Sequence, residues 1–272
     1  MGSISRQQPR IIAYWIGWQN LDFNPGNPVI PGYVKNIDVL ILAFALVKNG
    51  GIEYTCASNE TCVCNGSQYW SQEQIMTWVK NIRNNYPDIK VLLSIGGWAY
   101  NDWQTVTNAG TFAANAVNSL SSWQDTFDGL DIDYENGDGS LPPGVTFHDL
   151  MQALIGEMEA NLPGNPVLSF PYYSGSPFSI DSVAGLTCSI TFAATMGYGD
   201  DTGDYQALLA AGFRAANGFS NTMMPPGQIG SFVDQNNIKA AMFWNLCDPS
   251  EGPPAGFIVA LNESLLVSVS GG

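Results

Sequence analysis

The sequence predicts a single α/β domain in which eight strands, most of them followed by a helix, close into one (β/α)8 TIM barrel. Short apolar runs alternate along the chain with segments whose apolar residues recur at helical spacing. The 272 residues suffice for one large barrel or two small domains, and neither an internal repeat nor a linker divides them. An open, doubly wound sheet is the alternative, but no glycine-rich phosphate loop follows the first strand, so nucleotide binding is unsupported.

The strands are expected at short apolar or aromatic runs and at one acidic run. In chain order they cover Ile11–Trp18, Ile37–Val47, Ile89–Ile95, Asp128–Glu135, Val167–Tyr172, Ser189–Tyr198, Gly218–Met223 and Ile238–Leu246. The helices are expected over Gln72–Tyr86, Thr111–Phe127, Thr146–Asn161, Tyr205–Ala216 and Ala255–Val267. Pro87 ends the first helix, and Thr146 begins the third with a capping box that Asp149 completes. His148, the one histidine, is therefore interpreted as a helix-start residue and not as a ligand.

The cysteines indicate a disulfide rather than a metal site. The long polar loop Gly50–Ser71 holds three of the five, namely Cys56, Cys62 and Cys64. Four zinc ligands are not there, so we expect two of these three cysteines to form a local disulfide. Cys188 and Cys247 are expected to be buried thiols.

The composition is that of a globular protein, with 45% hydrophobic and 12% charged residues. Its net charge of −15 argues against the basic face that a nucleic-acid partner requires. No apolar run reaches membrane-spanning length, and we expect a secreted monomer with no membrane partner. We expect one domain over residues 1–272, with residues 1–10 as a disordered or tag-derived start.

The acidic run Asp128–Glu135 (DGLDIDYE) places four carboxylates in eight positions. Side chains two apart on a strand share a face, so Asp131, Asp133 and Glu135 project the same way, about 6.5–7 Å apart. Three like charges on one buried face are costly, and two close carboxylates resolve this by sharing a proton, which raises one pKa. Such perturbed pairs are typical of acid–base catalytic sites.

Two other interpretations of the acidic run stay open. A solvated strand edge would alternate acidic and apolar residues in the same way. However, helical segments precede and follow this run, and in a βα unit the C-terminal end of the strand carries the chemistry. Carboxylates also bind Mg²⁺ or Ca²⁺, but no acidic loop of calcium-binding spacing is present. We therefore favour acid catalysis, and we expect neither a metal nor a cofactor.

The octet DGLDIDYE resembles the DxxDxDxE signature of glycoside hydrolase family 18, the chitinases and their relatives. Ser94-Ile95-Gly96-Gly97 is similar to the SxGG motif that ends strand three in this family. Met196-Gly197-Tyr198 resembles the start of the strand-six motif, and Phe243-Trp244 resembles the position of the tryptophan that floors the sugar site. Tyr14 and Phe44 fit weaker positions. The resemblance covers nearly the whole chain.

This resemblance implies cleavage of chitin, or of another polymer of β-1,4-linked N-acetylglucosamine, with retention of configuration. The substrate's own N-acetyl group attacks the anomeric carbon. Glu135 would be the general acid and later the base, and Asp133 would orient and stabilise the acetamido group. Asp131 would lie beneath and share a proton with Asp133, and Asp128 and Ser94 would support these acids.

The resemblance also implies the residues that hold the sugar. Tyr198 would hydrogen-bond the acetyl carbonyl, Trp244 would stack beneath the sugar, and Trp98 would form a platform on the leaving-group side. The other implied substrate-binding residues are Met196, Tyr14, Phe44 and Gly97.

One residue departs from the family pattern. The family usually has Asp directly after the strand-six Tyr, whereas here Gly199 follows Tyr198, with Asp200 and Asp201 beyond. Either acid could supply the carboxylate by a local shift, and we place Asp200 among the supporting residues. The alternative is that this carboxylate is missing, which would affect substrate positioning and not the reaction class.

Many family members carry a small α+β insertion that walls the substrate groove. The stretch Met223–Asn237 is fifteen residues long and leaves no room for it, so an open groove and endo cleavage are expected. A groove closed by the Gly50–Ser71 loop is the alternative. Two other functions stay open: an endo-β-N-acetylglucosaminidase acting on the chitobiose core of N-glycans, and a non-catalytic sugar-binding lectin or inhibitor. Relatives of the latter kind typically lose the terminal Glu of the octet, and Glu135 is present.

Overall fold

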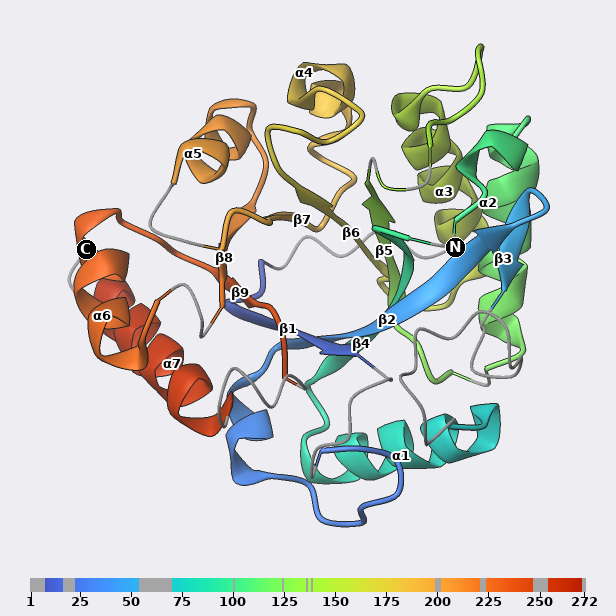
Figure 1. Ribbon diagram of the computed structural model, residues 1–272. Coiled ribbons are helices and arrows are strands. Elements are labelled where there is room, and N and C mark those ends of the chain that lie inside the picture. The colour runs from blue at the N-terminus through green and yellow to red at the C-terminus, as the bar shows by residue number, and fades with distance from the viewer. Residues whose placement is uncertain are drawn as a thin grey trace.

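The computed structural model describes residues 8–16, 23–53, 70–99, 101–123, 125–135, 137, 139–198, 202–220, 224–246 and 254–270. Its centre is a closed barrel of parallel strands (Figure 1). The barrel strands are β1 (Ile11–Ile16), β2 (Val39–Lys48), β4 (Lys90–Gly97), β5 (Gly129–Tyr134), β6 (Val167–Tyr172), β7 (Phe192–Thr195), β8 (Ala215–Phe219) and β9 (Ala241–Phe243). The ring closes because β1 pairs with both β2 and β9. The predicted (β/α)8 barrel is confirmed.

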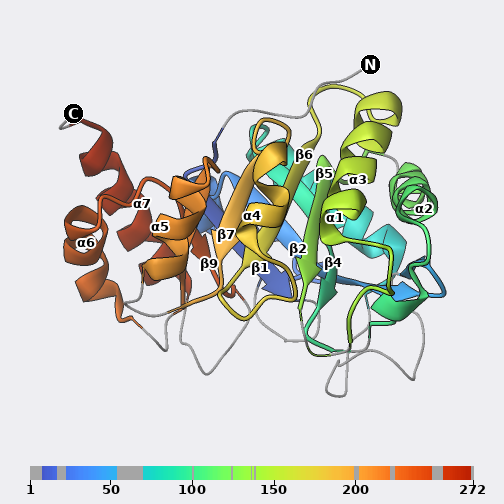
Figure 2. The same ribbon diagram turned by 90° about the horizontal axis from the view of Figure 1, so that it is seen from above.

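The helices cover the outside of the strands, as a view at right angles shows (Figure 2). They are α1 (Gln72–Asn85), α2 (Ala109–Ser121), α3 (Phe147–Asn161), α4 (Ile180–Val183), α5 (Gly203–Ala210), α6 (Pro226–Gln235) and α7 (Pro254–Ser270). Three 3-10 turns, at Gly32–Asn36, Trp103–Thr105 and Ala184–Leu186, and the short strand β3 (Gly51–Glu53), antiparallel to β2, complete the described elements. The predicted capping box of Thr146 and Asp149 begins α3.

The predicted boundaries are wrong around the seventh strand. A helix was expected over Tyr205–Ala216, but α5 ends at Ala210, and the segment that continues it becomes β8. Gly212, with φ of +90°, closes the helix by donating its N–H to Leu209 O. Ala215 and Ala216 then pair with β7, because burial between strand and helix layers outweighs the helix propensity of alanine.

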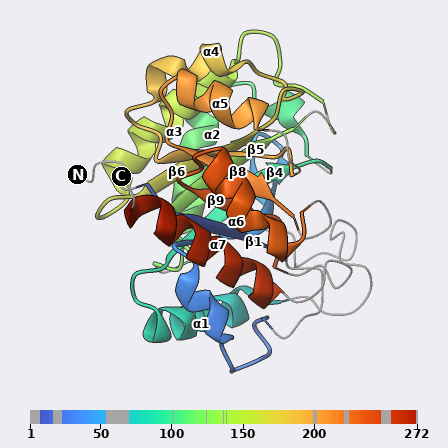
Figure 3. The same ribbon diagram turned by 90° about the vertical axis from the view of Figure 1, so that its left-hand side faces the viewer.

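The segment between β8 and β9 is short in the residues described. It holds helix α6, which the sequence did not indicate, and no insertion subdomain. Helices α6 and α7 pack side by side on one flank of the barrel (Figure 3). Among the described residues, the barrel therefore carries only helix α6 between β8 and β9.

Strand β5 buries both of its faces. Leu130 and Ile132 face the helix layer and are fully buried, while Asp131 and Asp133 face the barrel interior. Beyond them, Tyr134 stacks on Phe147 at the start of α3, with ring centroids 5.6 Å apart. The apolar side of the acidic run therefore anchors the strand to its covering helix, and the acids are held inside the barrel.

Candidate active site

A pocket of about 430 Å³ opens where the carboxyl ends of the barrel strands meet. Each of its walls comes from a different strand end, which is the usual location of the active site in this fold. The lining residues are Trp98 after β4, Asp133 and Glu135 of the β5 end, Tyr173 after β6, Met196 and Tyr198 after β7, and Trp244 after β9. All but Tyr173 were predicted as site residues, so the structure brings these predicted residues together.

Asp131 lies beneath the pocket at the centre of a hydroxyl network. Its carboxylate accepts hydrogen bonds from the hydroxyls of Tyr14 (2.8 Å), Ser94 (2.7 Å) and Ser169 (2.6 Å). Ser94 and Ser169 lie beside Asp131 because the register pairs them with it across β4 and β6. Burial raises the pKa of Asp131, and the three donated hydrogen bonds oppose that rise. The network therefore favours a fixed carboxylate under the pocket.

Asp133 lines the pocket, yet its side chain is only 3% exposed. Its Oδ1 atom is buried without any hydrogen-bond partner among the residues that the structure describes. Burial raises the pKa of Asp133 well above its ordinary value, and the charges of Glu135 and then Asp131 raise it further. An unpaired buried acceptor is costly, so this atom is suited to a donor that arrives with a ligand.

Asp133 makes no hydrogen bond to Asp131 in the described structure, where hydroxyls occupy both oxygens of Asp131. The expected proton sharing between these two acids therefore stays a prediction. Of the two neighbouring charges, that of Glu135 raises the pKa of Asp133 more than that of Asp131. Asp133 is thus linked at least as closely to the outer acid as to the inner one.

Glu135 follows β5 directly and is half-buried at the mouth of the pocket. Partial burial raises its pKa to about 7. A carboxyl group with such a pKa is protonated in a large fraction of molecules near neutral pH and can return to the carboxylate during a reaction. Glu135 therefore has the properties of a general acid and base.

Aromatic rings surround the opposite part of the pocket. Trp244 stacks on Tyr198 and on Phe44, with ring centroids 6.2 Å apart in each case, and it also contacts Tyr14 at 5.3 Å. Trp98, in contrast, is 59% exposed at the rim. The exposed indole and the half-buried one offer two separate aromatic surfaces to a ligand.

Three predicted substrate-binding residues lie behind this aromatic wall and not in the lining. Tyr14 is only 1% exposed and donates its hydroxyl to Asp131, so it contacts the inner acid, and its predicted contact with substrate stays a prediction. Phe44 packs behind Trp244. Gly97 is buried at φ of +88°, where an added Cβ would lie 3.0 Å from the Phe44 ring. These residues set the position of the wall.

Asp128 supports the site from a distance. It lies at the start of β5, where its carboxylate pairs with Arg83 at 2.6 Å and Lys90 at 3.2 Å and accepts the Val91 N–H at 2.9 Å. These bonds join α1, β4 and β5 at the opposite end of the strand from Glu135. The supporting role expected for Asp128 is therefore structural.

Several predictions fall outside the described residues. Asp200, Asp201 and Gly199 do so, as do the four cysteines Cys56, Cys62, Cys64 and Cys247. Cys188 is described and is exposed, so the prediction of a buried thiol there is wrong. The short turn before β7 places it at the surface, whereas Ile190, two residues later, is buried.

Tyr173 is the pocket residue that the sequence analysis missed. It directly follows the predicted strand Val167–Tyr172, at the same parity as Ser169, which faces the barrel interior. A residue in that place points toward the site by the alternation of strand side chains. The alternation pattern therefore indicated Tyr173, but the predicted strand ended at Tyr172 and the pattern was not extended to the next residue.

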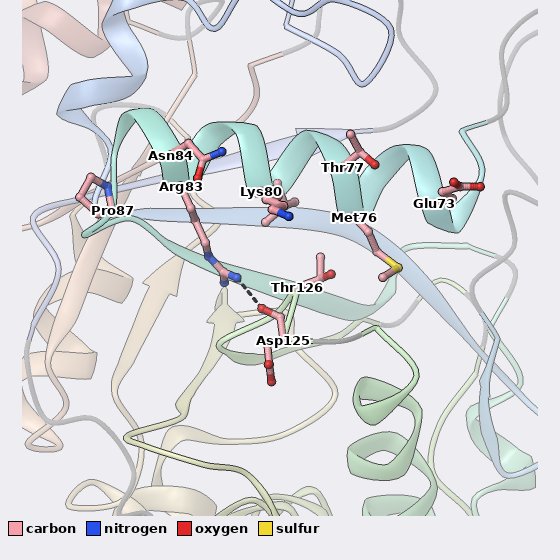
Figure 4. A pocket seen from close by; sticks show the side chains of 10 residues that line it. Glu73, Met76, Thr77, Lys80, Arg83, Asn84, Pro87, Asp125 and Thr126 are labelled. Carbon is pink, nitrogen blue, oxygen red and sulfur yellow. Dashed lines mark hydrogen bonds between the residues drawn. The ribbon is translucent and has the colours of Figure 1, made fainter.

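A second hollow of about 590 Å³ lies along α1 and beside the segment before β5 (Figure 4). Glu73, Lys80, Arg83 and Asp125 give it mixed charge, and Arg83 already donates to Asp125 O and Asp128. Its lining has no aromatic ring that could stack on a ligand. We therefore assign the chemistry to the smaller acidic pocket.

Neither a metal site nor a membrane span emerges from the described part of the chain. No group of three or more His, Cys, Asp or Glu side chains there could hold a metal ion. None of the described helices is long and apolar enough to cross a membrane.

Comparisons with known proteins agree with this geometry. The family model for glycosyl hydrolases family 18 matches residues 10–177. Chitinase A of Pseudoalteromonas piscicida is 36% identical over 95 residues, which cover 29% of this chain and 12% of that protein. Chitinase 63 of Streptomyces plicatus is 25% identical over 46% of this chain and 23% of its own length. The chain thus spans less than a quarter of these curated relatives.

Solved structures show the likeness of fold. Chitinase ChiW from Paenibacillus superposes with a TM-score of 0.73 at 14% identity, over 95% of this chain and 33% of that one. Human YKL-39, a pseudo-chitinase with retained chitooligosaccharide binding, superposes with a TM-score of 0.65 at 13% identity, over 94% and 99%. The same barrel therefore occurs both in a chitinase and in a pseudo-chitinase.

Proposed function

Since this chain belongs to glycosyl hydrolases family 18, we propose that it is a chitinase-like enzyme that cleaves internal β-1,4 bonds in polymers of N-acetylglucosamine. The observation that carries the proposal is the unpaired Oδ1 of Asp133, buried in the same pocket as an acid whose pKa is about 7. A polymer of N-acetylglucosamine brings an acetamido N–H as a donor for the first group and a glycosidic oxygen as a proton acceptor for the second.

The reaction follows from these two groups. Protonated Glu135 gives its proton to the glycosidic oxygen while the acetamido oxygen attacks the anomeric carbon and the bond to the leaving sugar breaks. Asp133 accepts the acetamido N–H and stabilises the positive charge of the oxazolinium that forms. The Glu135 carboxylate then takes a proton from water as the water attacks the same carbon, so the configuration is retained.

The rest of the pocket binds the sugar. Trp244 and Tyr198 both line the pocket; in our proposal the Trp244 indole stacks beneath the sugar ring and the Tyr198 hydroxyl hydrogen-bonds the acetyl carbonyl. The exposed Trp98 extends the binding surface beyond the acid. Endo cleavage is supported by the segment between β8 and β9, whose described residues form helix α6 and no subdomain that would close one side of the groove.

Two other functions share this pocket. An endo-β-N-acetylglucosaminidase would use the same acids on the chitobiose core of N-glycans. A sugar-binding protein would resemble human YKL-39, but Glu135, poised for proton transfer, favours an enzyme over it.

The experiment is incubation with a chitin oligomer ladder and, separately, with a high-mannose glycopeptide, followed by the masses of the products. Shortened oligomers with an untouched glycopeptide support the proposal. Release of the glycan alone assigns the second function, and binding without any product assigns the third. A steep early fall in viscosity of a soluble chitin derivative supports endo cleavage, whereas dimer as the sole first product contradicts it.

A further inference from the structure

We propose that Tyr173 is a specificity-determining residue that binds the sugar leaving the bond, through its phenolic hydroxyl. The inference rests on the proposed function and adds to it a residue that the signature motifs do not contain. Its basis is the position of Tyr173, the way its ring is held and the state of its hydroxyl.

Tyr173 and Trp98 flank the acid. In the barrel, β5 lies between β4 and β6, and the residues that follow these three strands are Trp98, Glu135 and Tyr173. Trp244 and Tyr198, which stack on one another, come from β9 and β7. A leaving group must contact the acid that protonates it. The wall on either side of Glu135 is therefore the part that a leaving sugar meets, while the stacked pair serves the other sugar.

The Tyr173 ring is held before any ligand binds. Its backbone N–H donates to Ser176 Oγ at 3.1 Å, and Ser176 N–H donates back to Tyr173 O at 2.9 Å, which closes a tight turn. A Cβ on Gly175 would lie 2.4 Å from Cε2 of the ring, so only glycine leaves room for this orientation. Ser174 N–H donates to Asp204 Oδ2 at 3.0 Å and ties the turn to α5. A ring fixed in this way loses little conformational entropy on binding.

The Tyr173 hydroxyl has no hydrogen-bond partner within the described part of the chain, although its ring lines the pocket. A phenolic hydroxyl both donates and accepts, which suits the hydroxyl and acetamido groups of a second N-acetylglucosamine. An aryl alcohol in the same place offers no such groups. Tyr173 therefore distinguishes a sugar leaving group from an aromatic one.

The test is Tyr173→Phe, which removes the oxygen and keeps the ring. We measure KM and kcat on the N-acetylglucosamine tetramer, and on the dimer that carries an aryl leaving group. For the tetramer, KM is expected to rise about fivefold, the effect of one lost neutral hydrogen bond. The aryl substrate is expected to keep its KM, and thermal unfolding checks that the fold is intact.

The matched control is Tyr172→Phe, one residue earlier. Tyr172 faces away from the barrel interior and packs on Phe178, with ring centroids 5.7 Å apart. This variant loses the same atom and is expected to keep the wild-type ratio of the two KM values.

The outcomes separate the two levels of inference. A Tyr173→Phe variant that changes both substrates equally, or neither, overturns the assignment of Tyr173 and leaves the proposed function standing. A wild-type protein that hydrolyses neither substrate overturns the proposed function, and the role of Tyr173 with it. As a second measurement, trimer binding in a Glu135→Gln background is expected to weaken with Tyr173→Phe if the contact exists.

Discussion

The two ends of strand β5 place carboxylate side chains in opposite electrostatic environments. At its start, the Asp128 carboxylate forms ion pairs with Arg83 and Lys90. At its end, Asp133 and Glu135 meet no cation among the described residues, and burial raises the pKa of both. Asp131 lies between them with hydroxyl partners only. A carboxylate paired with cations stabilises the fold, whereas one denied them retains the ability to exchange a proton.

The largest effect is expected where the acid is most exposed to substrate. Glu135→Gln keeps the shape of the side chain but cannot give or take the proton. We expect kcat to fall by at least about 10²–10⁴-fold, which is the usual contribution of general acid–base catalysis. Release of reducing ends from chitin oligomers measures it, and substantial residual turnover would contradict the role of Glu135.

Asp128→Asn is the control at the other end of the strand. It breaks the ion pairs of Asp128 with Arg83 and Lys90. The side chains of Asp128 and Arg83 are 22% and 26% exposed, so this pair is largely shielded from solvent. We expect a loss of about 1–3 kcal/mol in the free energy of unfolding, typical of bonds to charged groups, with little change in kcat. If this variant lost turnover as Glu135→Gln does, the contrast between the two ends would fail.

Asp133→Asn is expected to have the next largest effect. Removing one preorganised electrostatic group from a developing charge typically costs about 10²-fold in kcat, and KM is expected to change little because the contact strengthens only in the transition state. A change in KM alone would place Asp133 in ground-state binding.

The free energy of unfolding of Asp133→Asn tests whether Asp133 is buried at a cost to stability. The folded pKa of Asp133 is raised, so its effect on stability is most favourable at low pH and is lost as pH rises through that pKa. Asn removes this dependence. We therefore expect the variant to be at least as stable as the wild type at neutral pH, in contrast to Asp128→Asn, and denaturant unfolding measures both.

A pH profile sharpens the comparison further. Glu135 must be protonated to start the reaction, and its pKa is about 7. Below that pH the acid is in its active form, and above it kcat/KM is expected to fall about tenfold per pH unit. The Asp128→Asn variant is expected to show the same fall of kcat/KM at high pH. A profile that stays flat up to pH 9 would contradict the assignment.

The sequence allowed the acidic C-terminal end of β5 to be predicted because strand alternation and the acidic spacing are both local. The strand order that brings Trp98, Tyr198 and Trp244 together followed from the barrel and from the motifs. The positions of Tyr14 and Tyr173 did not follow, since they depend on depth within the barrel and on the turn after β6, which alternation does not specify. The boundary of β8 was missed because pairing with β7 outweighs the helix propensity of its alanines.

The smallest effect is expected from Tyr14→Phe, because Tyr14 affects Asp133 and Glu135 only through its hydrogen bond to Asp131. The variant removes one of three hydroxyl donors to Asp131 and leaves those of Ser94 and Ser169. With one donor fewer, the pKa of Asp131 rises further, so its negative charge beneath Asp133 is held less firmly. Phenylalanine keeps the ring that contacts Trp244, so the position of Trp244 is expected to be kept. We therefore expect kcat to fall about fivefold, the effect of one lost hydrogen bond, with KM unchanged. A rise in KM without a fall in kcat would mean that Tyr14 acts through the aromatic wall and not through the acid network.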